Sequence, residues 1–179
     1  GDPAPHFVVD TVDGEAFDFE PRALERPVML ISFRGGWCPY CNMHLSELRH
    51  AIPEIRGLGV DVLFLSGDRS ELLFESLNHE AREGIEGLDY TILSDANAQA
   101  AMALGIAFKA SARTIRRLNE KGKDITGSSM AGHGVLPVPA VFAVDRDGMN
   151  VYAYTNADFK LRVPGVELVA VAKDLAQPQ

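Results

Sequence analysis

The sequence is poor in cysteine, in long apolar runs and in positive charge, and each shortage excludes a class of protein. Two cysteines in 179 residues are too few for a disulfide scaffold. No apolar run approaches the ~18 residues that a membrane-spanning helix needs. The net charge is −8 and the pI is near 5.1, so the phosphates of a nucleic acid would repel the chain. We therefore expect a protein that binds neither nucleic acid nor a membrane.

The composition is otherwise that of an ordinary globular domain. Hydrophobic residues make up 46 % of the chain, which together with the modest charge excludes a disordered protein. A length of 179 residues fits one domain with its own core. No internal repeat or interdomain linker divides the chain, and no signal peptide is visible. We expect a single domain over residues 1–179, located in the cytoplasm.

Two continuous apolar runs frame a helical segment. Residues 28–33 and 60–66 have the uninterrupted hydrophobicity of strands that are covered on both faces of a sheet. Between them runs an apolar stripe at helical spacing, formed by Leu45, Leu48, Ile52 and Ile55. Pro53 lies inside this stripe and should kink the helix or end it early. The segment is predicted to be a β-α-β unit with parallel strands.

Further helices and strands are predicted after this unit. The patterns favour a helix over residues 71–83 capped by Ser70, and a strand over 90–93. Next come a helix over 97–104 capped by Asp95, and strands over 141–144 and 150–155 joined by an Asp-Gly turn. A helix over 165–176 ends the chain. Strands that alternate with helices indicate an α/β fold built on a central mixed sheet.

One stretch breaks the acidic pattern of the chain. Residues 109–123 carry six basic side chains against Glu120 alone, a local charge of +5 that leaves about −13 for the rest. Residues 126–134 then form a small, polar segment with glycines, which is typical of a mobile loop. Together, residues 109–134 read as a basic helix plus a flexible loop inserted into the domain. The basic face is either simply solvated or a docking face for an acidic partner or an anionic substrate.

The two cysteines sit three positions apart, at Cys38 and Cys41, where a helix is expected to begin. Trp37 precedes the pair, and Pro39 suits the first turn of a helix. The free N–H groups and positive dipole end of a helix stabilise a thiolate and lower its pKa. Spacing of three residues brings the two sulfurs close enough to form a disulfide. A Cys-x-x-Cys placed between strand and helix in a β-α-β unit indicates a redox site.

Two other interpretations of the cysteine pair are disfavoured by the sequence. A structural zinc site would need two further Cys or His ligands, and the histidines are scattered along the chain. His44, three residues after Cys41, is the one that could approach the pair. Two inert buried cysteines are disfavoured by Trp37 and Pro39. We therefore expect a redox site and no metal.

A proline near the C-terminal strands is a second candidate feature. Pro139 directly precedes the predicted strand 141–144, and a proline is tolerated at the first position of a strand. The bond before a proline is also the usual place for a cis peptide. Pro139 is thus either a cis-proline or an ordinary strand-entry residue, a role that Pro137 would fill equally well.

Five segments of the chain, taken in order, match one known pattern. They are residues 1–7, 13–14, 33–41, 138–140 and 142–148. In these segments the chain resembles the alkyl hydroperoxide reductase/thiol-specific antioxidant family of the thioredoxin-fold superfamily. The likeness spans nearly the whole chain and is greatest to the peroxiredoxin-like branch that carries a Trp-Cys-Pro-x-Cys motif. The resemblance implies a thioredoxin-like sheet flanked by helices and thiol-based redox activity.

The chain departs from the peroxiredoxin pattern at the residues that would bind peroxide. In the resemblance, the family's attacking cysteine falls on Cys41, its threonine on Cys38 and its proline on Arg34. The arginine that orients the peroxide falls on Pro139. Of the three peroxide-binding groups, the cysteine is kept, and the threonine and the arginine are replaced by Cys38 and Pro139. Arg34 or Arg162 would have to stabilise the charge that develops on the O–O bond.

Three functions remain open on the sequence. In a peroxidase, Cys41 attacks H₂O₂ or an alkyl hydroperoxide, and Cys38 resolves the sulfenic acid as a disulfide. In a thiol–disulfide oxidoreductase, Cys38 attacks a protein disulfide, Cys41 resolves the mixed disulfide, and Pro139 shapes the docking surface. In a metal carrier, the two thiols and a histidine bind an ion. The resemblance favours the peroxidase, and the residues at the site favour disulfide exchange.

The resemblance also implies partners. Either redox cycle uses no bound cofactor and an external thiol reductant of the thioredoxin or glutathione type. A homodimer is suggested by the resemblance to peroxiredoxins. Because the chain has no third cysteine, any resolving thiol is Cys38, Cys41 or a thiol of another molecule.

Overall fold

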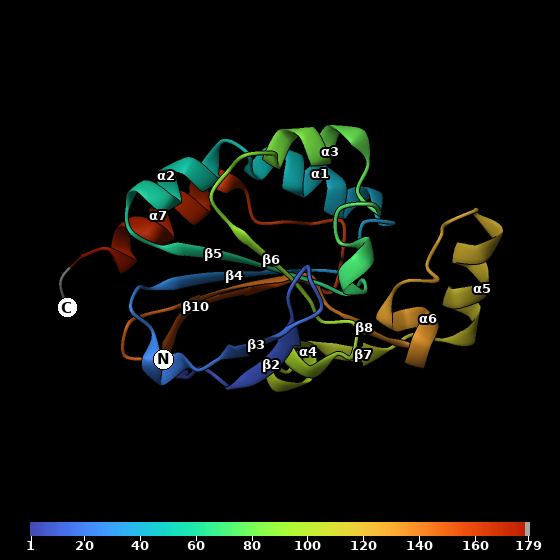
Figure 1. The fold of residues 1–179 in the computed structure, drawn as a ribbon, viewed down its shortest axis with the longest axis horizontal. Coiled ribbons are helices and arrows are strands. Elements are labelled where there is room, and N and C mark those ends of the chain that lie inside the picture. The colour runs from blue at the N-terminus through green and yellow to red at the C-terminus, as the bar shows by residue number, and fades with distance from the viewer. Residues whose placement is uncertain (178–179) are drawn as a thin grey trace.

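The two apolar runs form adjacent parallel strands at the centre of one sheet. In the computed structural model, which describes residues 1–177, β4 (Val28–Phe33) and β5 (Asp61–Ser66) pair in parallel with Val28 opposite Asp61. All six residues of β4 are buried, because the sheet is covered on both faces (Figure 1). The predicted β-α-β unit is therefore confirmed.

The sheet has eight strands in the order β1-β10-β9-β4-β5-β6-β2-β3. β6 (Thr91–Ser94) is parallel to β5, whereas β9 (Ala140–Val144) is antiparallel to β4. β10 (Met149–Thr155) forms the predicted hairpin with β9. Three short N-terminal strands were not predicted, because none exceeds four residues; they are β1 (Asp2–Pro3), β2 (Phe7–Asp10) and β3 (Ala16–Phe19). The mixed sheet of a thioredoxin-like α/β fold is thus confirmed.

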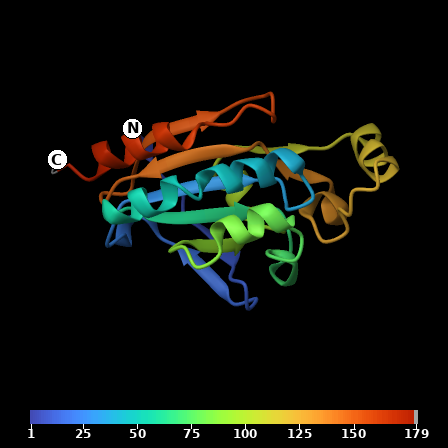
Figure 2. The ribbon, with the colours of Figure 1, turned by 90° about the horizontal axis from the view of Figure 1, so that it is seen from above.

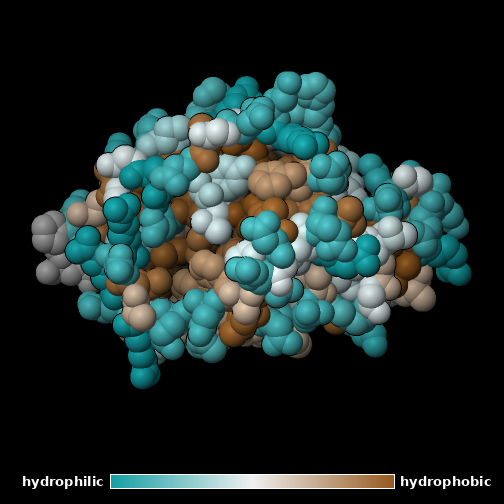
Figure 3. Space-filling model, viewed as in Figure 1, coloured by the Kyte–Doolittle hydropathy of each residue, from teal (hydrophilic) through white to brown (hydrophobic). Residues whose placement is uncertain are grey.

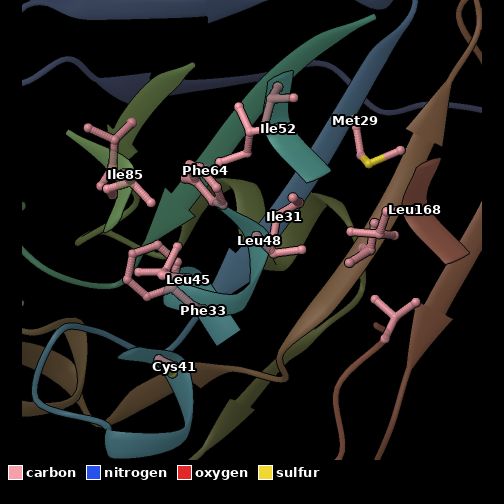
Figure 4. Close-up of a cluster of buried hydrophobic side chains, with 14 of the residues drawn as sticks. Met29, Ile31, Phe33, Cys41, Leu45, Leu48, Ile52, Phe64, Ile85 and Leu168 are labelled. Atoms are coloured by element: carbon pink, nitrogen blue, oxygen red, sulfur yellow. The ribbon is translucent and has the colours of Figure 1, made fainter. Parts of the chain in front are cut away.

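Helices cover both faces of this sheet (Figures 1 and 2). One face carries α1 (Pro39–Leu48), α2 (Ala51–Gly57), α3 (His79–Ile85) and α7 (Gly165–Leu175). The other carries α4 (Gln99–Ala103). A single 3-10 turn, η1 (Pro21–Ala23), precedes β4. Figure 4 shows part of the core under the first face, with Cys41 at its margin.

The helix after the cysteines is interrupted, as Pro53 predicts. α1 ends at Leu48, and α2 begins at Ala51, so that Pro53 falls in the first turn of α2. An N–H in that turn has no partner within the helix, and its loss costs little. The apolar stripe nevertheless continues across the break, since Leu48 and Ile52 are both buried.

The predicted helix over residues 71–83 is wrong in its first half. A 3-10 turn, η2 (Ser70–Leu72), is followed by a bend, and α3 begins only at His79. Asn78, not Ser70, caps α3, because its side chain accepts a hydrogen bond from the Ala81 amide at 2.9 Å. The capping signal of Ser70 therefore marked only a single turn.

The basic segment contains more structure than the sequence predicted. β7 (Ala107–Lys109) leads into α5 (Ala112–Glu120), and α6 (Ser129–His133) leads into β8 (Val135–Pro137), which pairs with β7. The segment expected to be a loop thus contains α6, and Met130 within it is buried. Across residues 1–177, no helix is both long and apolar enough to cross a membrane.

Candidate active site

The cysteines lie at the junction between the end of β4 and the start of α1. β4 ends at Phe33, and Cys38 occupies the N-cap of α1 in an extended conformation. Cys41 lies in the first turn of the helix. Both cysteine residues are 1 % exposed and reduced. The predicted arrangement of strand, turn and Cys-x-x-Cys helix is confirmed.

The turn before Cys38 depends on two glycines. Gly35 has φ +150°, and a Cβ there would collide with the Trp37 indole and lie 2.8 Å from Asp68 Oδ1. A Cβ on Gly36 would collide with Ser76. The Trp37 ring and the bend before α3 can approach this turn only because both positions lack a side chain.

Two buried polar residues hold the turn in place. Asp68 Oδ2 accepts hydrogen bonds from the Gly36 amide and from Ser76 Oγ, both at 2.7 Å. Asn42 Nδ2 donates to the carbonyl of Gly36 at 2.7 Å and to that of Cys38 at 3.0 Å. Burial raises the pKa of Asp68 above its usual range, and the two hydrogen bonds it accepts oppose that change.

Sequence reasoning missed both of these residues, although a signal for Asp68 was present. Asp68 follows β5, whose end meets the end of β4 at the same edge of the sheet. A polar residue directly after the second parallel strand is thereby brought beside the cysteine turn. Asn42 follows Cys41 within the helical stripe, and nothing in its spacing indicates that its side chain points back to the turn.

The pKa values of the two cysteine thiols are shifted in opposite directions. A hydrogen bond from the Cys41 side chain, supported by the charges of Arg34 and Arg162, lowers the pKa of Cys38 to about 6. Complete burial raises the pKa of Cys41, and the negative charge of Cys38 raises it further. At neutral pH, Cys38 is therefore the thiolate, and Cys41 is the thiol that donates to it.

Both arginines singled out in the sequence lie at the site. Arg162 Nη2 is 3.4 Å from Cys41 Sγ, and its Nε donates to the carbonyl of Phe159 at 2.8 Å. Arg34 is 7 % exposed, and its guanidinium lies over Trp37, 5.0 Å from the ring centroid, and over Phe159, at 4.5 Å. Neither arginine forms an ion pair within residues 1–177, so the cysteine thiolate is their nearby anionic group.

Three buried donors at this site have no acceptor among residues 1–177. They are Arg34 Nε, Trp37 Nε1 and Arg162 Nη1. A buried N–H group without a partner is costly, so such groups in one cluster indicate a place for an acceptor. Nitrogen donors beside a thiolate suit a ligand that carries oxygen atoms.

Pro139 is buried, and of the two alternatives for it the structure shows the ordinary strand-entry residue. No bond in residues 1–177 is cis, so the Val138–Pro139 bond is trans and Pro139 is the strand-entry residue of β9. Pro139 also lines, with His44 and Arg162, a crevice that is too narrow for a water molecule. The proline is therefore near the site, as predicted, but in the ordinary isomer. Pro39, by contrast, is exposed at the first position of α1.

His44 forms no hydrogen bond with either sulfur among residues 1–177. Its Nε2 lies 2.9 Å from the carbonyl oxygen of Val163. Burial lowers the pKa of His44 to about 4, so the ring is neutral at pH 7. In residues 1–177, no three His, Cys, Asp or Glu side chains gather in a group that could hold a metal ion. The histidine instead joins α1 to the segment that carries Arg162.

Comparisons with known proteins agree with the geometry. Residues 1–153 match the AhpC/TSA family. A thiol-disulfide oxidoreductase ResA of Bacillus thuringiensis is 22 % identical over 92 % of this chain and 75 % of its own length. Peroxiredoxin Bcp of Escherichia coli is 30 % identical over 59 % of this chain and 64 % of its own length.

Solved structures share the fold. Peroxidoxin BcpB of Mycobacterium tuberculosis superposes with a TM-score of 0.65 over 99 % of this chain and 97 % of its own, at 15 % identity. Peroxiredoxin 6 of Arenicola marina gives a TM-score of 0.73 over 98 % of this chain and 72 % of its own, at 18 % identity.

Proposed function

Because the chain belongs to the AhpC/TSA family, and is a thiol-dependent oxidoreductase, we propose that it reduces hydroperoxides with Cys38 as the attacking sulfur. One observation carries the assignment of the sulfurs: the pKa of Cys38 is lowered to about 6, whereas that of Cys41 is raised. The thiolate is the nucleophile in cysteine chemistry. Cys41, as the buried thiol beside it, is the resolving residue.

The two cysteines account for every bond and electron in the proposed peroxidase reaction. The Cys38 thiolate attacks one oxygen of the hydroperoxide, the O–O bond breaks, and the departing alkoxide or hydroxide takes up a proton. Cys38 is then a sulfenic acid. The Cys41 sulfur attacks it, forms the disulfide and releases the hydroxyl group as water. The hydroperoxide gains two electrons, and the dithiol loses them.

The two arginines supply the positive charge that the family's peroxide-orienting arginine would otherwise provide. Arg34 and Arg162 both favour the Cys38 thiolate, and each has a buried N–H group without an acceptor in residues 1–177. These donors would stabilise negative charge on the departing oxygen in a water-poor site. The sulfurs are so deeply buried that small hydroperoxides such as H₂O₂ are the favoured substrates.

This assignment reverses the order of attack that the family pattern implies. The pattern places the attacking cysteine at Cys41, where the thiol is fully buried and its pKa is raised. Cys38 instead occupies the N-cap of α1, where the helix dipole favours a negative charge. A Cys-x-x-Cys pair in this fold therefore supports peroxide attack from its first cysteine.

Exchange with a protein disulfide is the second candidate function. The low pKa of Cys38, with a resolving thiol three residues later, is also what disulfide exchange requires. In that reaction, Cys38 attacks a partner disulfide, and Cys41 then releases the partner as a dithiol. The buried N–H groups of Arg34, Trp37 and Arg162 that lack an acceptor in residues 1–177 favour the peroxidase, because they suit a small ligand that carries oxygen atoms.

The two functions are separated by measuring both on the same reduced protein. Trp37, the single tryptophan, lies by the cysteine pair and reports its oxidation by fluorescence. We expect H₂O₂ to oxidise the pair on the order of 10³-fold faster than it oxidises free cysteine, given charge stabilisation at the site. The product should be the intramolecular disulfide, two hydrogens lighter by mass. Oxidation no faster than that of free cysteine, with rapid reduction of an insulin disulfide, would reverse the order of the candidates.

The proposed cycle ends with an external reductant. The disulfide must be returned to the dithiol by a thiol of the thioredoxin or glutathione type, because the chain has no third cysteine. A peroxiredoxin-like homodimer and a cytoplasmic site of action belong to the same proposal, and sedimentation of the reduced protein tests the dimer.

A further inference from the structure

α5 presents a strongly basic face, in which Glu120 is the one acidic residue among the helix's own side chains. Arg113, Arg116 and Arg117 are exposed, and none of them forms an ion pair within residues 1–177. Three neighbouring lysines also form no ion pair within these residues; Lys109 and Lys121 are exposed, and Lys123 is half-buried. Figure 3 shows that the end of the molecule carrying α5 is mostly hydrophilic on the face in view. We call these six residues the α5 basic face.

The helix is fixed to the body of the protein, so this face has a defined orientation. Ile115 and Leu118 are half-buried and pack against the main core. Ser111 caps the helix, because its Oγ accepts a hydrogen bond from the Thr114 amide at 3.1 Å. The apolar residues thus point inward, and the arginines point away from the core.

The α5 basic face lies at the cysteine end of the molecule. Both views of the ribbon place α5 at the end where β4 leads into α1 (Figures 1 and 2). Contacts agree with this placement: after α5, the Ser129 amide donates to the carbonyl of Gly67 at 2.7 Å. The next residue, Asp68, accepts the hydrogen bond from the Gly36 amide in the cysteine turn. Two hydrogen bonds, one to Gly67 and one to its neighbour Asp68, therefore connect the segment after α5 to the active site.

The form of this surface favours a macromolecule over a small anion. The shallow hollow beside Arg113, Arg116 and Arg117 is lined by α5 alone, with the carboxylate of Glu120 among its lining residues, and it has no opposing wall. A small anion would stay largely solvated there. The rest of the chain carries a net charge of about −13, which disfavours the approach of an acidic protein there relative to the α5 basic face. An acidic protein would therefore be turned toward the cysteine end.

We propose, building on the function proposed above, that the α5 basic face docks an acidic dithiol protein that reduces the Cys38–Cys41 disulfide. A thiolate of this partner attacks one sulfur of the disulfide, the S–S bond breaks, and the released sulfur leaves as a thiolate. The second thiol of the partner then attacks the mixed disulfide. Two electrons pass to the cysteine pair, which takes up the protons, and the partner becomes a disulfide.

The test compares two charge-reversed variants with equal net charge. The first is Arg113→Glu/Arg116→Glu/Arg117→Glu. The matched control is Arg22→Glu/Arg146→Glu/Lys173→Glu, which changes three exposed residues without ion pairs in residues 1–177. Arg146 follows β9, whose end pairs with the start of β4, so it lies at the opposite end from the cysteines.

Reduction is measured on protein whose cysteine pair has been oxidised with diamide, so that no peroxide step is involved. The reductants are a purified acidic thioredoxin-type dithiol protein and, separately, dithiothreitol. At low salt, we expect the α5 variant to react with the dithiol protein at least ~10-fold more slowly than the control variant, because electrostatic steering is lost. Added salt should remove the difference. Dithiothreitol should reduce both variants at the same rate.

Each other outcome has a definite meaning. Equal rates of the two variants with the acidic dithiol protein would overturn the docking proposal, whatever the peroxidase activity. The proposal would also be overturned if the only effect of the α5 substitutions were a change in sedimentation, which would indicate that a second copy of the chain binds there. It would likewise be overturned if their only effect were loss of binding to phosphatidylserine vesicles, which would indicate a membrane. Failure of H₂O₂ to oxidise the wild-type protein would instead overturn the proposed function and leave the docking result standing.

Discussion

Two sets of arginines lie at the same end of this molecule and differ in their surroundings. Arg34, which is buried, and Arg162, which is half-buried, pack around the cysteine pair; we call them the buried set, because each has a buried N–H group without a partner in residues 1–177. Arg113, Arg116 and Arg117 project from α5 into solvent. Neither set forms ion pairs in the described part of the chain. The two sets therefore differ chiefly in how much water screens their charge.

This difference separates two uses of one residue type. A charge in a water-poor interior acts strongly over a few ångströms, and here it acts on the sulfur atoms. A charge in water acts weakly on any single group, but several of them steer an approaching partner. Changing the buried set should alter the chemistry, and changing the exposed set should alter only the encounter.

The largest effect is expected when both arginines of the buried set are removed. In Arg34→Met/Arg162→Met, we expect the second-order rate constant with H₂O₂ to fall about 10³-fold, because no cation remains to stabilise the departing oxygen. Stopped-flow fluorescence of Trp37 measures this rate. The control, Arg146→Met/Lys160→Met, removes two exposed charges and should react like the wild type. A loss below tenfold in a variant that still folds would contradict the role given to the buried set.

Replacing the two arginines of the buried set one at a time should separate their effects on the two sulfurs. Arg34 favours the Cys38 thiolate more strongly than Arg162 does, whereas Arg162 contacts Cys41. Arg34→Met should therefore raise the pKa of Cys38 more than Arg162→Met, with rate losses of roughly tenfold or more for each. Arg162→Met should slow disulfide closure more, as seen by a longer-lived sulfenic acid. Identical behaviour of the two variants would show that the arginines act as one undivided charge.

The pH dependence of the thiolate tests the hydrogen bond between the sulfurs. With the pKa of Cys38 at about 6, its alkylation by iodoacetamide should be constant above that pH and fall about tenfold per unit below it. Cys41→Ala removes the donor and should move the midpoint upward, while Cys41→Ser keeps a donor and should move it less. A midpoint that stays near the usual range for cysteine in the wild type would refute the lowered pKa.

The smallest effect is expected at the exposed set. Arg113→Ala/Arg116→Ala/Arg117→Ala should change the free energy of unfolding by no more than about 0.5 kcal/mol per position, because these side chains are exposed and unpaired in the described structure. Its rate with H₂O₂ should equal that of the wild type. Urea unfolding and stopped-flow fluorescence measure the two quantities. A slower reaction with H₂O₂ would mean that the exposed set also acts on the sulfurs.

The site could be predicted from the sequence where its parts are local. The apolar run of β4, the turn and the spacing of Cys38 and Cys41 lie within one short segment, and that segment folds as predicted. The start of α3 was predicted incorrectly, because the side chain of Asn78, and not that of Ser70, caps this helix. Which of the two residues caps the helix depends on where the chain bends, and local sequence patterns do not predict that bend.

Contacts between residues that are far apart in the chain could not be predicted from the sequence. Arg162 lies 121 positions from Cys41, and only the packing of the segment before α7 against α1 brings them together. Sequence reasoning proposed this arginine but could not place it. The isomer of the bond before Pro139 and the role of Asp68 in holding the turn depend in the same way on tertiary structure.

The assignment of Cys38 as the attacking sulfur is tested most directly by trapping the sulfenic acid. Cys38→Ser and Cys41→Ser proteins are exposed to H₂O₂ with dimedone, and the labelled residue is identified by mass spectrometry. We predict rapid labelling of Cys38 in the Cys41→Ser protein and no labelling above the rate of free cysteine in the Cys38→Ser protein. Rapid labelling of Cys41 in the Cys38→Ser protein, with an unreactive Cys38 in the other variant, would contradict the account.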